Sequence, residues 1–271
     1  MIDMTMLNYM DKLLKSKGFN SETETLSFGL GNSKLDDVIT FSLPAGYSCP
    51  FAKDCRSCAI KNPRKRHDIG DRRKFIIKDG PKTQFRCSAA IDEALKPAVR
   101  ESRWKNFLTL RNACEKGLSS VIDLLEKSLP PTKWNKPTRL AVSGDFFSQT
   151  YFDAWLEVIR RRPNRPFYGY TKALPFWIAR YNHIPNNLIL TASYGGTHDH
   201  LIKEYGLKSV KVVKSPEEAM ELGLPIDHDD SLAMEKYTDF ALVVHGIQPK
   251  GVWARAWKAL VKRGMGGYKR A

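Results

Sequence analysis

The sequence predicts an α/β protein built around parallel strands. Two observations lead to this class. Short apolar runs rich in β-branched and aromatic residues recur along the chain, and helical patterns separate several of them. Strands that alternate with helices pair in parallel through crossover connections. Six such strands can form an open doubly wound sheet or an incomplete barrel, and both keep their chemistry at the carboxyl ends of the strands.

The six expected strands share a high content of Val, Ile, Leu, Phe, Tyr and Thr, which suit a buried pleated surface. They are residues 38–44, 140–144, 167–171, 188–193, 209–213 and 240–246. Residues 59–137 break the alternation of strand and helix. We therefore expect them to form an insertion, basic at first and then helical, between the first two strands of a single domain covering residues 1–271.

Helical patterns fill several gaps between these strands. Residues 151–162 place apolar side chains at offsets of 0, 3, 4 and 7, which is one face of a helix: Phe152, Trp155, Leu156 and Ile159. Ser215 followed by Pro216 is a typical helix start. Thr197 is expected to precede another helix. Within the insertion, residues 88–129 are expected to form a long helical segment.

Composition and length set the class of protein. The chain has 271 residues, of which 42% are hydrophobic and 27% charged, as in ordinary globular proteins. It contains no run of about 18 apolar residues, so no membrane span is expected. Its start lacks the apolar region of a secretory signal. These features predict a cytoplasmic protein, in the host cytoplasm if a phage encodes it.

The net charge of +15 suggests a polyanionic partner, with DNA or RNA as the first expectation. The excess is concentrated in two places. Residues 61–74 hold seven basic side chains against two acidic ones, and the tail of residues 252–271 holds no acidic residue. The alternative is a solvated surface that only keeps the protein soluble. The sequence specifies no oligomeric state.

Cysteine is used unevenly, and this is the main functional signal. The chain has five cysteines, and Cys49, Cys55 and Cys58 lie within ten residues just after the first strand. Cys87 is a further candidate ligand, whereas Cys114 lies in a helical pattern and is expected in the core. An odd number of thiols in a reducing compartment argues against disulfides. Uneven spacing on a loop favours a 4Fe–4S cluster, with structural zinc and unliganded thiols as alternatives.

Several sequence blocks resemble known families. Three cysteines after the first of six α/β strands resemble the radical S-adenosylmethionine superfamily, whose core is a partial (β/α)6 TIM-like barrel. The blocks SLPAGYSCPFA, FRCSAA, SGDFFS, YTKALPFW, GGTHDHL and IDHDDS resemble the phage and actinobacterial family called gene product eighty-eight. This resemblance spans most of residues 31–251. It implies a radical-SAM-like barrel that carries an iron–sulfur cluster.

One departure from the superfamily pattern concerns the cofactor. Radical SAM enzymes typically use Cys-x3-Cys-x2-Cys and leave the fourth iron free for S-adenosylmethionine. Here five residues separate Cys49 from Cys55, and Cys87 could occupy the fourth iron. A fully ligated cluster cannot hold S-adenosylmethionine in the usual way. S-adenosylmethionine is therefore expected only in the alternative in which Cys87 does not bind the cluster.

Polar residues at other strand ends complete the candidate site. By resemblance, Gly144 and Asp145 lie where radical SAM enzymes bind the amino group of the cofactor, although Asp145 could instead cap the following helix. Lys172 ends the third strand and could bind an anionic substrate or remain solvated. His245 ends the sixth strand and could face the same edge or be a hydrogen-bonded core residue.

Two further clusters carry weaker signals. His198 follows a Gly195-Gly196 turn that could bind a phosphate or carboxylate at a helix start. Residues 227–230 (DHDD) could bind a divalent cation, but we expect them to orient basic partners at a strand end.

The sequence thus predicts a 4Fe–4S protein with a radical-SAM-like barrel, with a redox or catalytic role near nucleic acid. The first alternative is a true radical SAM enzyme with three cluster cysteines. The second is a zinc-stabilised protein that binds nucleic acid and catalyses nothing. The sequence does not decide whether the protein is an enzyme.

Overall fold

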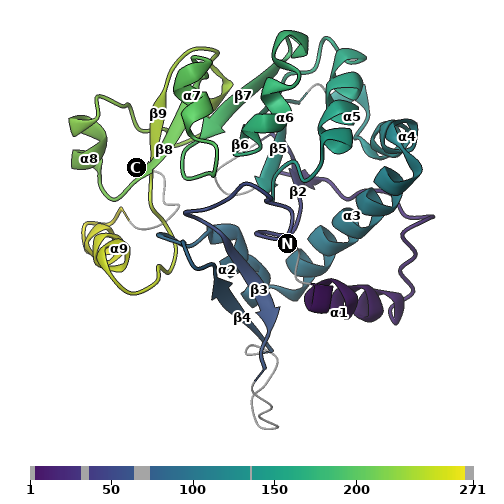
Figure 1. Ribbon diagram of the computed structural model, residues 1–271, viewed down its shortest axis with the longest axis horizontal. Helices are drawn as coiled ribbons and strands as arrows, with labels where there is room; N and C mark the ends of the chain where they lie inside the picture. The colour runs from purple at the N-terminus through teal and green to yellow at the C-terminus, as the bar shows by residue number, and fades with distance from the viewer. Residues whose placement is uncertain (1–3, 32–36, 64–73, 135, 266–271) are drawn as a thin grey trace.

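The computed structural model describes residues 4–31, 37–63, 74–134 and 136–265 of the chain (Figure 1). The fold is a mixed α/β arrangement centred on a mostly parallel sheet. Most of the basic segment 61–74 and the end of the basic tail 252–271 lie outside the described residues. The structure therefore describes only part of the two segments in which the positive charge is concentrated.

The main sheet has seven strands in the order β1-β2-β5-β6-β7-β8-β9. The strands are β1 (Gly29–Leu30), β2 (Ile39–Ser42), β5 (Thr138–Ser143), β6 (Phe167–Thr171), β7 (Leu188–Ser193), β8 (Ser209–Val213) and β9 (Phe240–Val243). β1 pairs antiparallel to β2, and all the other neighbours are parallel. The six expected strands are therefore present, and the α/β class with parallel pairing is confirmed.

Consecutive order in the sheet corrects one expectation. A doubly wound sheet reverses its strand order at a switch point. From β2 to β9 the order follows the chain without reversal, so the doubly wound alternative is wrong. In the described residues β1 and β9 are not paired with each other, so the sheet is open and no closed barrel forms.

Helices surround the sheet and fill the connections. They are α1 (Met4–Lys15), α2 (Ser88–Leu95), α3 (Pro97–Lys116), α4 (Leu118–Ser128), α5 (Gln149–Arg160), α6 (Leu174–Ile178), α7 (His200–Glu204), α8 (Pro216–Glu221) and α9 (Val252–Lys262), with short 3-10 turns η2 (Thr132–Trp134), η3 (Tyr181–His183) and η4 (Leu232–Met234). α3, α4 and α5 pack together on one side of the molecule, and α9 lies on the other side (Figure 1). None of the helices within the described ranges is long and apolar enough to cross a membrane.

The largest core cluster joins one face of the sheet to these helices. Phe41, Leu140 and Phe167 from three strands pack with Phe152 and Trp155 of α5, and all five are almost fully buried. The predicted apolar face of α5 is confirmed, since all four of its expected members are buried. Burying five such side chains contributes roughly 10 kcal/mol before conformational entropy is subtracted.

The insertion between β2 and β5 contains an element that the sequence did not predict. A two-stranded antiparallel sheet, β3 (Ser57–Lys61) and β4 (Phe75–Asp79), precedes the helices. Figure 1 shows this hairpin projecting from the main body. The single helical segment expected over residues 88–129 is three helices. The helix is interrupted at Lys96–Pro97 and again at Gly117, whose φ is 112°.

Two predicted helix starts have different outcomes. The Ser215 hydroxyl accepts a hydrogen bond from the Glu218 amide, so Ser215 caps α8 as expected. Thr197 is not the cap of the next helix. α7 begins only at His200, and Asp199 occupies the N-cap position.

Gly144 allows the end of β5 to approach the loop that follows β2. Its φ is 77°, and a Cβ there would lie 2.3 Å from the Ser48 Oγ and 2.7 Å from the Leu43 Cβ.

We predict that Gly144→Ala lowers the free energy of unfolding by about 3 kcal/mol, because it adds left-handed backbone strain and overpacking. Gly206→Ala is the matched control, since its φ is 56° but no atom lies within 4 Å. Gly206→Ala should lower the free energy of unfolding by only about 1 kcal/mol. Urea titrations of both variants measure the two losses. Equal losses in the two variants would contradict the close packing.

Candidate metal centre

The cysteine loop after β2 is fixed to the loop after β7. The amides of Lys53 and Asp54 donate to the Gly195 carbonyl at 3.0 and 2.9 Å, and the Thr197 amide donates to the Phe51 carbonyl at 2.9 Å. Gly195 has a φ of 93°, and a Cβ there would lie 3.0 Å from the Asp54 Cβ. Two loops far apart in sequence therefore meet at the carboxyl edge of the sheet.

The segment that carries Cys87 is bound to the same loop. The Asp54 carbonyl accepts hydrogen bonds from the amides of Gln84 and Phe85 at 2.7 and 3.1 Å. Two residues further along the chain, the Arg56 carbonyl accepts a hydrogen bond from the Gly80 amide at 2.7 Å. These bonds hold the chain that leaves β4 against the cysteine loop, and Cys87 follows at the start of α2.

Three thiols share one neighbourhood. Burial raises the pKa of Cys49 well above its ordinary value, and negative charge on Asp145, Cys87 and Cys55 adds to the effect. Burial likewise raises the pKa of Cys87 to about 11, with a further contribution from Cys55. Cys55 and Cys87 therefore lie near enough to Cys49, and Cys55 near enough to Cys87, for their charges to act on these thiols from two separate segments.

Backbone amides oppose these shifts. The Gly46 N–H lowers the pKa of Cys49, and the N–H groups of Ala89 and Ala90 lower that of Cys87. Cys87 occupies the N-cap position of α2, although its side chain makes no cap hydrogen bond. Partial positive charge from amides near sulfur stabilises the thiolate form that binds metals.

Cys58 lies beside this group on the hairpin. In β3 it is paired with Lys78 of β4, and its thiol donates to the Lys78 carbonyl at 3.7 Å. A Cβ at Gly46 would be 3.0 Å from the Cys58 Cβ, so Cys58 packs against the loop residue whose amide acts on Cys49. Cys114 is elsewhere, packed against the core with its sulfur 3.8 Å from the Ser148 Oγ.

The thiols are chemically suited to an iron–sulfur cluster. Cys49 and Cys55 lie on a loop, Cys58 lies in β3 and Cys87 begins α2, with amides directed at two of these sulfurs. Thiolate sulfur is the usual ligand of such clusters. Across residues 4–31, 37–63, 74–134 and 136–265, no group of three or more Cys, His, Asp and Glu side chains is arranged to hold a metal ion. The ligand set Cys49, Cys55, Cys58 and Cys87 therefore stays a prediction.

Asp145 is a buried carboxylate next to Cys49. It accepts hydrogen bonds from the Thr171 hydroxyl at 2.6 Å and from the amides of Lys172 and Phe146 at 2.8 Å. Burial raises its pKa, although these donors oppose the rise. Asp145 does not cap α5, because the Ser148 hydroxyl takes that role.

Lys172 is nearly buried at the end of β6, so the solvated alternative is wrong. Its Nζ donates to the Ser193 hydroxyl at 2.5 Å, at the end of β7. Its amide binds Asp145. Lys172 therefore links the carboxyl ends of three neighbouring strands close to the cysteine loop.

The Gly195-Gly196 turn does not offer free amides to an anion. Both N–H groups donate to the Asp199 carboxylate at 2.8 Å. An external phosphate would have to displace that carboxylate, so the predicted anion site is wrong. His198 lies on the exposed rim, with its ring packed edge-on against Phe51 at 5.1 Å.

The loop after β9 closes the opposite side of the candidate site. His245 is half-buried at its start. The Gln248 side chain accepts a hydrogen bond from the Arg86 amide at 2.8 Å and donates to the His245 carbonyl at 2.8 Å. A Cβ at Gly246 would lie 3.1 Å from Ile91 of α2. The end of the sixth parallel strand thus reaches the segment of Cys87.

The acidic segment 227–230 lies away from the thiols. The Asp230 carboxylate pairs with Arg139 at 2.5 Å and accepts from the hydroxyls of Tyr168 and Tyr170 at 3.2 and 3.4 Å. Arg139 is the second residue of β5, at the end opposite Asp145. As expected, this segment orients a basic partner at a strand end.

Glu93 is a site residue that the sequence did not reveal. It is fully buried on α2 and accepts hydrogen bonds from the Ala45 amide at 2.9 Å and from Arg103 at 2.8 Å. Ser143 at the end of β5 donates to the same oxygen at 3.4 Å. Glu93 therefore joins the helix of Cys87, the cysteine loop and the sheet. A lone Glu in a helical pattern gives no local sign of this role.

The fold and these thiols define an α/β protein with a cysteine-lined edge on its parallel sheet. The profile of the family described as Gene product 88 matches residues 11–264. Because this match covers most of the chain, the protein belongs to the Gene product 88 family, and that part of the predicted resemblance is confirmed.

A curated relative covers a smaller part of the chain. The gene 88 protein of Mycobacterium phage L5 is 32% identical over 111 residues, which is 38% of this chain and 45% of that protein. The aligned part thus spans less than half of that relative. No solved structure matches the chain.

The raised pKa of Cys87 predicts slow alkylation of the reduced, metal-free protein. The thiolate is the reactive form, so below pH 11 the rate for Cys87 should rise about tenfold per pH unit. Residue-resolved mass spectrometry after iodoacetamide pulses measures this rate. The control is the same peptide in urea-unfolded protein, whose rate should level off near pH 9. A folded-state plateau at or below pH 9 would show that burial does not hold this thiol protonated.

Proposed function

We propose that the protein holds a 4Fe–4S cluster through Cys49, Cys55, Cys58 and Cys87. The observation that carries this proposal is that Cys55 and Cys87 raise the pKa of Cys49, and Cys55 raises that of Cys87, across two chain segments that backbone hydrogen bonds hold together. Half-buried thiols that repel each other as anions are costly to deprotonate unless a cation compensates their charge. Iron in a cluster supplies that compensation.

The residues around the thiols have distinct parts in this proposal. When bound, the cluster would supply one-electron transfer. The amides near Cys49 and Cys87 would stabilise the thiolates and raise the reduction potential. Glu93 and the Gly195 carbonyl would hold the ligand segments in place. Arg86 forms an ion pair with Asp79 at 2.7 Å, so its charge is partly neutralised before it acts on the cluster.

The barrel of the radical SAM type belongs to the same proposal. Six parallel strands in consecutive order support it, since a partial (β/α)6 barrel has that order. A true radical SAM enzyme would use Cys49, Cys55 and Cys58, leave Cys87 free and place Gly144 and Asp145 on the cofactor. The rise that Cys55 causes in the pKa of Cys87 favours the four-thiolate arrangement over this alternative.

We further propose a redox or catalytic role near nucleic acid in the cytoplasm of a bacterial host. The net charge of +15 supports a polyanionic partner. Reducing conditions in that compartment keep thiols available for iron. A zinc-stabilised binding protein remains the second candidate, because Cys55-x-x-Cys58 is also a zinc-chelating unit.

Anaerobic purification followed by iron, zinc and acid-labile sulfide analysis tests the cluster. We predict about four iron and four sulfide per chain and the paramagnetic resonance signal of a reduced cluster. Single Ala variants of Cys49, Cys55 or Cys58 should lower the iron content severely, whereas Cys87→Ala should keep a cluster with one iron exposed. Cys114→Ala is the matched control and should retain all of the iron, because Cys114 is only packed against the core, near Ser148.

Other outcomes distinguish the alternatives. Stoichiometric zinc without sulfide would reject the cluster. In the four-thiolate arrangement the unmutated protein does not bind S-adenosylmethionine, whereas Cys87→Ala exposes an iron that can. Binding by the unmutated protein, with an altered resonance signal, would instead favour the radical SAM alternative.

A further inference from the structure

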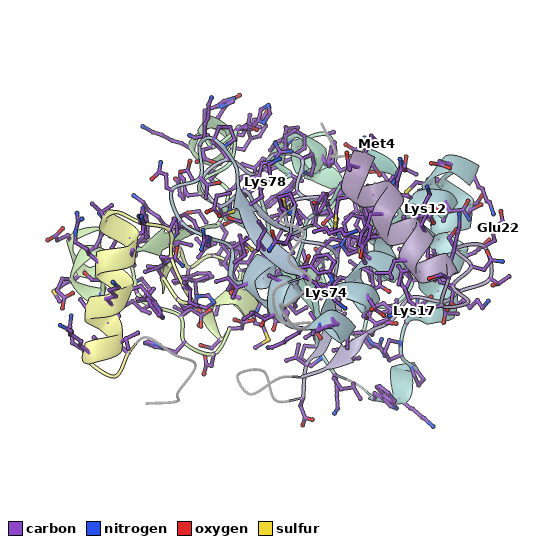
Figure 2. The ribbon with its side chains drawn as sticks, turned by 90° about the horizontal axis from the view of Figure 1, so that it is seen from below. Met4, Lys12, Lys17, Glu22, Lys74 and Lys78 are labelled. Atoms are coloured by element: carbon purple, nitrogen blue, oxygen red, sulfur yellow. The ribbon has the colours of Figure 1, made fainter. Side chains whose placement is uncertain are left out.

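We propose that the solvent face of α9 binds the phosphate backbone of double-stranded nucleic acid. This deepens the partner part of the proposed function by naming the surface and the way it binds. α9 lies at the end of the molecule opposite α1, which carries Lys12 (Figure 2). The surface is defined by Arg255, Lys258 and Lys262.

These three cations lie on one exposed face of the helix. Offsets of 3 and 7 residues from Arg255 bring Lys258 and Lys262 into one stripe, and all three side chains are exposed. Residues 249–265 contain no Asp or Glu. Protein surfaces usually intersperse both signs of charge, so a helix face with cations alone is unusual.

The stripe is not used for contacts within the protein. Arg263 pairs with Glu217 at 2.8 Å. By contrast, Arg255, Lys258 and Lys262 have no carboxylate within ion-pair distance among the residues that the structure describes. Arg255 also lies near the positive end of the helix dipole, where a cation is disfavoured. Helix stability therefore does not account for the charge at Arg255.

The opposite face of α9 is attached next to the candidate metal centre. Leu260 is buried, and the Trp253 ring packs on Phe85 with 5.0 Å between centroids. Phe85 precedes Cys87 by two residues, and Phe85 is hydrogen-bonded to the Asp54 carbonyl. A polyanion on the outer face of α9 would thus lie one helix away from the cysteines.

The chemistry of the exposed face identifies the type of nucleic acid. Single-strand binders stack bases on exposed aromatic rings. Trp253 and Trp257 are half-buried on the protein side, and the exposed positions of α9 carry cations and small aliphatic side chains. Arg and Lys side chains can contact guanine edges, but three exposed cations on one face supply mainly the sequence-independent contacts to phosphates. We therefore expect duplex binding that depends on salt and not on sequence.

The test measures binding of the full-length, anaerobically purified protein to a labelled DNA duplex of arbitrary sequence between about 50 and 200 mM salt. The variant Arg255→Gln/Lys258→Gln/Lys262→Gln should reduce the slope of log affinity against log salt by about 3. The charge-matched control is Lys12→Gln/Lys116→Gln/Lys127→Gln, on α1, α3 and α4. It should leave the slope unchanged.

Three results would overturn the proposal. They are no binding at the lowest salt, an equal loss in the control variant, or tighter binding of a single strand than of a duplex of the same length. Comparable affinity for duplexes of unrelated sequence would support it. Iron content should be the same in both variants. The two proposals can thereby be rejected separately. If the cluster proposal is wrong, iron is missing from the unmutated protein, whereas the α9 proposal is rejected by the binding results alone.

Discussion

The carbonyl oxygens of Gly195 and Asp54 receive the hydrogen bonds on which the candidate site depends. Gly195 fixes the cysteine loop to the end of β7, and Asp54 fixes the chain that leads to Cys87. Cys49 and Cys87 lie on segments separated by a hairpin, and these contacts join the two segments together with the bond from the Ala45 amide to Glu93. Because both contacts are between backbone groups, they depend little on side-chain identity, apart from the left-handed conformation at Gly195.

The two ends of the parallel sheet have different chemistry. At the carboxyl end, thiols and the carboxylates of Asp145 and Glu93 are buried together, so several groups there are held away from their ordinary pKa values. Near the amino end, Arg139 neutralises Asp230. Glu93 is paired with Arg103, but no cation among the described residues lowers the pKa of Cys49 or Cys87, so these thiols need a bound cation to ionise. This contrast is the reason for placing function at the thiols.

Local sequence pattern was sufficient for the six parallel strands and for the apolar face of α5, but not for the short antiparallel strand β1. Fully buried parallel strands are continuous apolar runs, so residues such as those of β6 and β7 were recognisable without their neighbours. The hairpin β3–β4 was not, because Cys58-Ala59-Ile60 is short and follows a cysteine loop directly. The site was only partly predictable. The clustering of Cys49 and Cys55 is visible in the sequence, but the occupation of the Gly195 and Gly196 amides by Asp199 and the role of Glu93 arise from long-range contacts.

Anomalous diffraction at the iron absorption edge, from crystals grown without oxygen, tests the central claim most directly. We predict a strong iron peak within bonding distance of the sulfurs of Cys49 and Cys87, at the carboxyl edge of the sheet. A map without iron at this position, or with Cys87 turned away from a cluster held by the other cysteines alone, would contradict the account.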